Sequence, residues 1–127
     1  MTLRLIIDTH VLLWWLADDG KLKAHVRAVL AAPENLVFVS AATIWELRIK
    51  EGLGKVDLPA DFEKELDAQS FEQLSVTAAH AHALRGLPLH HRDPFDRMLV
   101  AQASLEGLTI VSHDDALRAY GVPLIFT

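Results

Sequence analysis

The sequence predicts an α/β fold in which a mainly parallel central sheet lies between two layers of helices. Short apolar runs typical of buried strands alternate with longer stretches of helical periodicity. Strands separated by helices pair in parallel, because a parallel pair needs a long crossover connection. The chain has 127 residues, of which 51% are hydrophobic, so it can bury one core. We therefore expect one domain over residues 1–127.

The first half of the chain is expected to contain two strands and three helices. The strands are placed at residues 3–7 and 36–39, and the first two helices at residues 9–17 and 22–32. Pro33 ends the second helix. Ser40 has the side chain of a helix N-cap, so a third helix should begin there and run toward Gly52.

The second half continues the alternation of strands and helices. Further strands are expected at residues 71–74, 108–111 and 123–126, and helices at residues 59–69, 77–86, 94–107 and 113–120. Gly86 and Pro88 end the second of these helices. Asp93 is expected to cap the third, because Pro94 then occupies its first position.

Composition excludes several classes of protein. The chain has no cysteine, which rules out disulfides, thiolate zinc sites and a cysteine nucleophile, and fits a reducing cytoplasm. No run resembles a signal peptide or is long enough to span a bilayer, so we expect a soluble protein without membrane contact. The net charge of -5 argues against a broad basic surface for nucleic acid.

Acidic residues follow the predicted strands at three places. Asp8 follows the first strand, Glu46 lies on the helix after the second, and Asp114 follows the strand at 108–111. A fourth acid, Asp96, lies in the first turn of the helix that Asp93 caps. Because a parallel sheet gathers the carboxyl ends of its strands at one edge, we expect these carboxylates to meet. Carboxylate oxygens are hard ligands that favour Mg²⁺ or Mn²⁺.

The aspartates also have ordinary structural explanations. Asp8 and Asp114 are suited to cap helices, and Asp96 offsets the positive end of a helix dipole. Asp115 competes with Asp114 for the fourth acidic position.

Glu46 is harder to explain as a structural residue. At helical spacing it shares a side with Ala42, Ile49 and Leu53, and Trp45 flanks it. A carboxylate on an apolar face is costly unless it is paired or binds a metal. We therefore interpret the four acids as a metal cluster.

The histidines and tryptophans are less informative. His80, His82, His90 and His91 cluster in the sequence, but His80 and His82 point to different sides of a helix. We therefore do not expect a zinc site. Trp45 is expected in the core or at a subunit contact, and Arg97 is a candidate for contact with substrate phosphate.

Four blocks, in the same order, resemble the PIN-domain family over nearly the whole chain, and within it the toxin nucleases of bacterial VapBC-type toxin–antitoxin pairs. The blocks are DTHVLLWWL, SAATIWELRIKEGLGKVDLP, HHRDPFDRMLVAQA and TIVSHDDALRAYGV. The resemblance implies a three-layer α/β/α sandwich. Asp8, Glu46, Asp96 and Asp114 match the four acidic positions of the family. Thr9 and Ser112 match the accompanying hydroxyl residues and, with Arg97, are the candidate substrate contacts.

The resemblance also implies an activity and partners. It predicts a Mg²⁺- or Mn²⁺-dependent endoribonuclease that hydrolyses structured RNA with a metal-activated water. Such a toxin is expected to be a homodimer that a cognate antitoxin inhibits by covering the active-site groove. The alternative is a PIN-like module that has lost catalysis and binds RNA or protein. A response-regulator receiver does not fit, because Asp8 is followed by Thr9 instead of a second acid.

Overall fold

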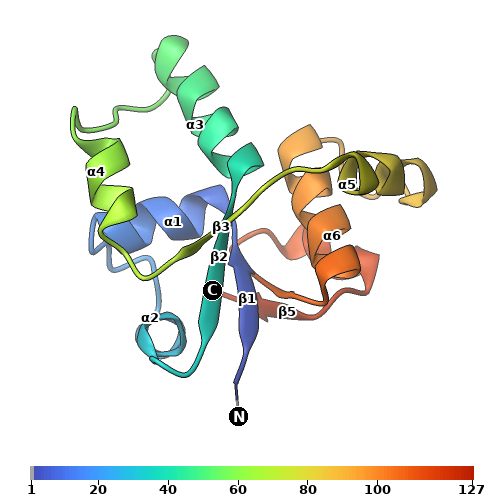
Figure 1. Cartoon of the computed structure of the whole chain (residues 1–127), viewed down its shortest axis with the longest axis horizontal. Coiled ribbons are helices and arrows are strands. Elements are labelled where there is room, and N and C mark those ends of the chain that lie inside the picture. Colours follow the sequence, from blue (N-terminus) through green and yellow to red (C-terminus); the bar gives the residue numbers. More distant parts are fainter. Residues whose placement is uncertain (1) are drawn as a thin grey trace.

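The central sheet has five parallel strands in the order β3-β2-β1-β4-β5 (Figure 1). The structure is a computed structural model and describes residues 2–127. The strands are β1 (Arg4–Ile7), β2 (Leu36–Ser40), β3 (Glu72–Leu74), β4 (Thr109–Ser112) and β5 (Leu124–Phe126). All five expected strands are present, each within about one residue of its expected bounds.

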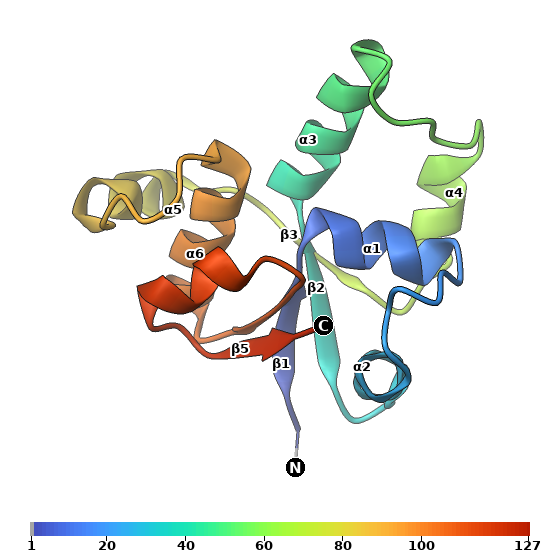
Figure 2. The same cartoon turned by 180° about the vertical axis from the view of Figure 1, so that it is seen from behind.

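Helices cover both faces of the sheet, so the predicted three-layer α/β/α class is confirmed (Figures 1 and 2). One side carries α1 (Thr9–Leu16), α2 (Ala24–Ala31) and α4 (Phe62–Asp67), and the other carries α5 (Ala78–Ala83) and α6 (Pro94–Glu106). The helix α3 (Ala41–Gly52) rises from the end of β2. Two 3₁₀ helices complete the set, η1 (Leu84–Gly86) and η2 (Asp115–Tyr120).

Alternation along the strands divides the core between the two faces. Leu5 and Ile7 of β1 are fully buried in the core under α1 and α2, whereas Ile6 between them is buried against α6. Val111 and Ile110 of β4 divide in the same way. Because helices cover both faces of a parallel sheet, its strands are apolar at every position, and this explains the continuous runs in the sequence.

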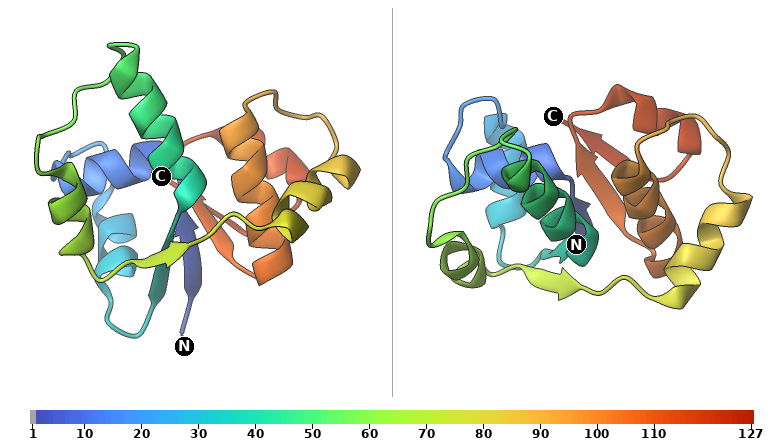
Figure 3. Two further views of the ribbon diagram at one scale, coloured as in Figure 1. Left: turned by 45° about the horizontal axis from the view of Figure 1, so that its top comes forward. Right: turned by 90° about the horizontal axis from the view of Figure 1, so that it is seen from above.

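The order of the strands places three carboxyl ends next to one another. β1 lies between β2 and β4, so the chain leaves the sheet toward one side after β1 and returns on the other side at β4. The segments that follow β1, β2 and β4 therefore start at the same edge of the sheet, at a switch point of the kind where ligands bind in open parallel sheets (Figure 3). Within residues 2–127, no helix is long and apolar enough to cross a membrane.

Candidate active site

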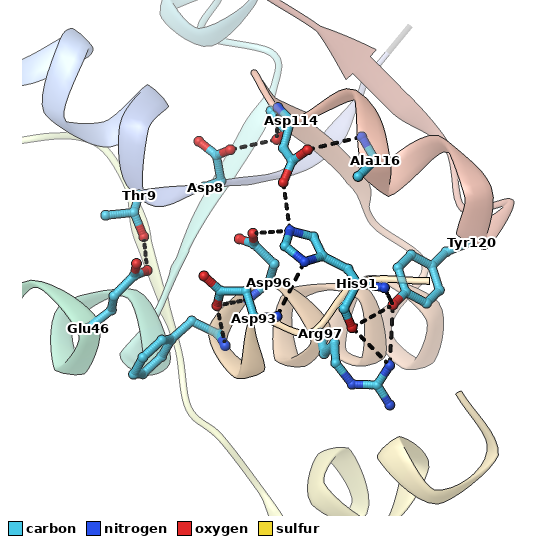
Figure 4. A network of polar contacts seen from close by, with 12 residues as sticks. Asp8, Thr9, Glu46, His91, Asp93, Asp96, Arg97, Asp114, Ala116 and Tyr120 are labelled. Carbon is cyan, nitrogen blue, oxygen red and sulfur yellow. Dashed lines mark hydrogen bonds and ion pairs between the residues drawn. The ribbon is translucent and has the colours of Figure 1, made fainter. Parts of the chain in front are cut away.

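Asp8 is both a helix cap and a buried member of the cluster. Its Oδ1 accepts a hydrogen bond from the Val11 amide at 2.9 Å, which caps α1. Its Oδ2 accepts one from Ser112 Oγ at 2.5 Å, which links the ends of β1 and β4 (Figure 4). Burial raises the pKa of Asp8, and these hydrogen bonds oppose that rise. Asp8 therefore caps α1 with one carboxylate oxygen and belongs to the acidic cluster with the other.

Glu46 is also buried, but its surroundings differ from those expected. Its Oε1 accepts a hydrogen bond from Thr9 Oγ1, and its Oε2 lies 2.6 Å from Lys50 Nζ one helical turn later. Leu53 is 65% exposed and Ile49 is 39% exposed, so the apolar face assigned to Glu46 is buried only toward Ala42. Glu46 is buried because the first turn of α1 covers it, and its cationic partner is Lys50. The hydrogen bond to Glu46 raises the pKa of Lys50.

The start of α6 confirms Asp93 as the cap and places Asp96 in the cluster. Asp93 Oδ1 accepts hydrogen bonds from the amides of Phe95 and Asp96, at 2.8 and 3.2 Å. The carboxyl group of Asp96 points toward the ends of β1 and β4 (Figure 4). Burial, together with the nearby carboxylates of Asp93 and Asp8, raises the pKa of Asp96 to about 7.

Asp114, and not Asp115, reaches the cluster. Asp114 Oδ1 caps η2 by accepting from the Ala116 amide at 3.0 Å, and its Oδ2 lies 2.7 Å from His91 Nε2. The side chain of Asp115 is 73% exposed and pairs with Arg118 on the outer surface. Ser112 Oγ accepts a hydrogen bond from the Asp114 amide while it donates to Asp8, so it orients two of the acids.

The four acids line one cleft of about 250 Å³ at the switch point of the sheet. Its walls are Asp8, Thr9, His10, Glu46, Lys50, Asp93, Asp96, His113 and Asp114. One side-chain nitrogen of His91 and carboxylate oxygens of Asp96 and Asp114 lie within 4.8 Å of one another. The only lysine among these walls is held by Glu46, so the aspartates face the cleft without a lysine or arginine partner there. This donor set fits a hard divalent cation.

The structure does not bring Arg97 into this cleft. Its guanidinium group donates to the carbonyls of Pro88 and Leu87, at 2.9 and 3.3 Å, and to the Tyr120 hydroxyl at 3.2 Å. These contacts hold the loop before α6 (Figure 4). Contact between Arg97 and substrate phosphate stays a prediction that this geometry does not favour.

Sequence reasoning missed four residues of the site: His10, Lys50 and His113 line the cleft, and His91 contacts two of its acids. Lys50 carried a signal, because it follows Glu46 by four residues on one helix, and such pairs face each other. For His91 the only signal in the sequence was its position, two residues before Asp93 in HHRDPFD. His91 lies against the carboxylates of Asp96 and Asp114, and its proximity to other histidines in the sequence does not indicate this contact.

Comparison with known proteins identifies the class to which this fold and this acidic cleft belong. The family model of the PIN domain matches residues 5–123, so the chain belongs to the PIN-domain family, and this prediction is confirmed. A comparison with curated proteins found no significant match.

Solved structures with a similar fold come from toxin–antitoxin complexes. VapBC2 from Rickettsia felis, bound to a promoter DNA fragment, gives a TM-score of 0.75 at 15% identity, and the match covers 98% of each chain. FitAcB from Neisseria gonorrhoeae gives 0.69 at 20% identity, covering 97% of this chain and 96% of that chain. DNA-bound VapBC from Salmonella typhimurium gives 0.63 at 17% identity, covering 98% of both. At these identities the likeness shows a common fold.

Replacing Asp93 with alanine is expected to weaken the start of α6 more than the chemistry of the cleft. The amides of Phe95 and Asp96 lose their acceptor, and loss of such a cap lowers the free energy of unfolding by about 1 kcal/mol. Urea unfolding of Asp93→Ala and of the wild type measures this change. Asp115→Ala is the matched control, because its exposed carboxylate caps no helix. An Asp93→Ala protein of unchanged stability would contradict the capping role.

Proposed function

We propose that this chain is a metal-dependent endoribonuclease, the toxin of a type II toxin–antitoxin pair. In this proposal residues 1–127 form one PIN-like nuclease domain that acts in the cytoplasm, where its RNA substrates are. The observation that carries the proposal is the convergence of Asp8, Glu46, Asp96 and Asp114 on one cleft. Capping alone explains the positions of Asp8 and Asp114, but it does not explain why all four acids line the same small space.

In this proposal Asp8, Asp96 and Asp114, with Glu46 on the opposite wall, hold Mg²⁺ or Mn²⁺. A divalent cation in such a site acidifies an attacking water and neutralises charge on the scissile phosphate. Thr9 orients Glu46, and Ser112 orients Asp8 through short hydrogen bonds. Lys50 restrains Glu46 and brings a positive charge to the rim, where it favours the approach of a phosphate.

The size of the cleft supports a flexible strand as the substrate. A space of about 250 Å³ accepts a phosphate with part of a nucleotide, as a flexible strand would present it. Loops of structured RNA present such strands, with unstacked bases and free backbone. The choice of RNA over DNA is supported by the resemblance to toxin ribonucleases.

Two observations support an antitoxin partner: the solved structures with a similar fold, and a groove on the surface of this chain. The solved structures with a similar fold include VapBC and FitAB complexes. A larger groove of about 670 Å³ runs between α3, α4 and β3, with Ile44, Phe62, Leu66 and Phe71 in its lining. Trp45, 64% exposed, lies at the groove on the helix that carries Glu46. We propose that an apolar antitoxin segment occupies this groove.

We also propose that the protein is a homodimer. Light scattering of the isolated protein measures its molar mass and so checks this proposal.

The experiment that tests the proposed activity is a challenge of total RNA with the antitoxin-free protein. With Mn²⁺ or Mg²⁺ present, we expect discrete new RNA ends. When EDTA chelates the metal, these ends should not form. Sequencing of these ends identifies the target. A protein that binds RNA and Mn²⁺ but leaves the pool uncut would support the alternative, an inactive PIN-like binding module.

A further inference from the structure

We propose that His91 is a positioning residue that ties Asp96 to Asp114 and so sets the spacing of two acids in the cleft. His91 Nε2 lies 3.0 Å from Asp96 Oδ2 and 2.7 Å from Asp114 Oδ2 (Figure 4). One nitrogen therefore bridges carboxylates from two separate elements, the start of α6 and the turn after β4. This inference rests on the proposed function, because it concerns the same cation site.

The hydrogen bonds of the ring identify which nitrogen carries the proton. The Asp93 amide donates to His91 Nδ1 at 3.2 Å, and an amide can only donate, so Nδ1 is an acceptor without a proton. The proton of the neutral ring is then on Nε2, where it points at the two carboxylates. In this tautomer Nε2 has no free lone pair. His91 thus serves the acids as a donor and is not itself a metal ligand.

The position of His91 is fixed by contacts outside the cleft. Its amide donates to the Tyr120 hydroxyl at 2.9 Å, and Tyr120 belongs to η2, which Asp114 caps. Arg97 holds the preceding loop through the carbonyls of Leu87 and Pro88. The imidazole is therefore presented to the acids by a braced segment, and this explains why Arg97 is turned away from the cleft.

A hydrogen-bond donor shared by two carboxylates offsets the repulsion between their negative charges. Asp8, Asp96 and Asp114 line the same small cleft, so their ionised carboxylates repel one another. A shared donor holds Asp96 and Asp114 together against that repulsion before any cation arrives. Hydrogen-bond partners of metal-binding carboxylates commonly contribute about 10- to 100-fold to metal affinity. We expect a contribution of that size from His91.

The test is the affinity for Mn²⁺ alone, measured from the electron paramagnetic resonance signal of free Mn²⁺. His91→Ala should bind Mn²⁺ about 10- to 100-fold more weakly than the wild type. In His91→Gln an amide N–H takes the place of Nε2–H, so its affinity should stay closer to that of the wild type. His25→Ala is the matched control. His25 is exposed on α2, away from the cleft, so its loss should leave the affinity unchanged.

Pulsed electron paramagnetic resonance of bound Mn²⁺ separates positioning from direct ligation. We expect no ¹⁴N coupling that depends on His91, and such a coupling, present in the wild type and lost in His91→Gln, would overturn the positioning role. Equal Mn²⁺ affinities of the wild type and His91→Ala would overturn it as well. So would a folded His91→Gln protein that binds as weakly as His91→Ala. A wild type that binds no Mn²⁺ would contradict the proposed function itself, so the two failures are distinguishable.

Discussion

Asp96→Asn is expected to remove Mn²⁺-dependent cleavage of RNA, with a loss on the order of a hundredfold to a thousandfold in rate. The substitution keeps the shape of the side chain but removes a negative charge from the centre of the cleft, where a divalent cation needs it. Asp8→Asn should have the same effect for the same reason. Cleavage of a defined RNA, with Mn²⁺ affinity measured in parallel, checks both variants.

Loss of activity in these variants should not reflect loss of folding. Burial raises the pKa of Asp8 and of Asp96, so at neutral pH and above each ionised carboxylate destabilises the metal-free protein. A neutral asparagine at either position should therefore give an equal or higher midpoint of urea unfolding. Asp115→Asn is the control for general charge effects, because its side chain lies on the outer surface. Loss of cleavage in Asp115→Asn, with cleavage retained in Asp114→Asn, would reverse the assignment of the fourth acid.

The fold was predictable because local signals and the global fold agree in this chain. Continuous apolar runs mark the strands, since both faces of the sheet are covered. Ser40 and Asp93 mark helix starts, and both accept hydrogen bonds from the amides of the first turn. The helix expected over 113–120 is a 3₁₀ helix beginning at Asp115, a difference too small for sequence patterns to resolve.

The contacts within the site were less predictable, because they join distant segments. The spacing of Glu46 along α3 indicated that it was unusual, but the apolar face assigned to it is buried only at Ala42, since Leu53 and Trp45 are exposed to solvent. Periodicity alone does not tell which side of a helix faces the protein. The bridge from His91 to Asp114 spans 23 residues and depends on the fold of the loop before α6. No local pattern reports such a contact.

The stability of the metal-free protein should depend on pH through Asp96. Its pKa rises from 3.8 to about 7 on folding, so in this interval the folded state holds a proton that the unfolded state has released. Stability therefore falls as the pH rises from about 4 to about 7, and Asp96 adds no further change above that range. Asp8, whose pKa burial also raises, contributes a slope of the same sign that remains in Asp96→Asn. The contribution of Asp96 is therefore the part of the slope that Asp96→Asn loses, and urea unfolding of both proteins across this range measures it. A difference in stability that is independent of pH would contradict the raised pKa.

Binding of Mn²⁺ should show the opposite dependence on pH. Below about pH 7 the cation must displace the proton of Asp96, so its affinity should rise with pH and level off once the carboxyl group is ionised. Stabilisation by Mn²⁺ should thus be small at about pH 5.5 and large at about pH 8, where the unbound carboxylates are most destabilising. The same burial that weakens the empty protein at high pH would make the cation a structural requirement there. Equal stabilisation at both pH values would show that the cation binds without Asp96.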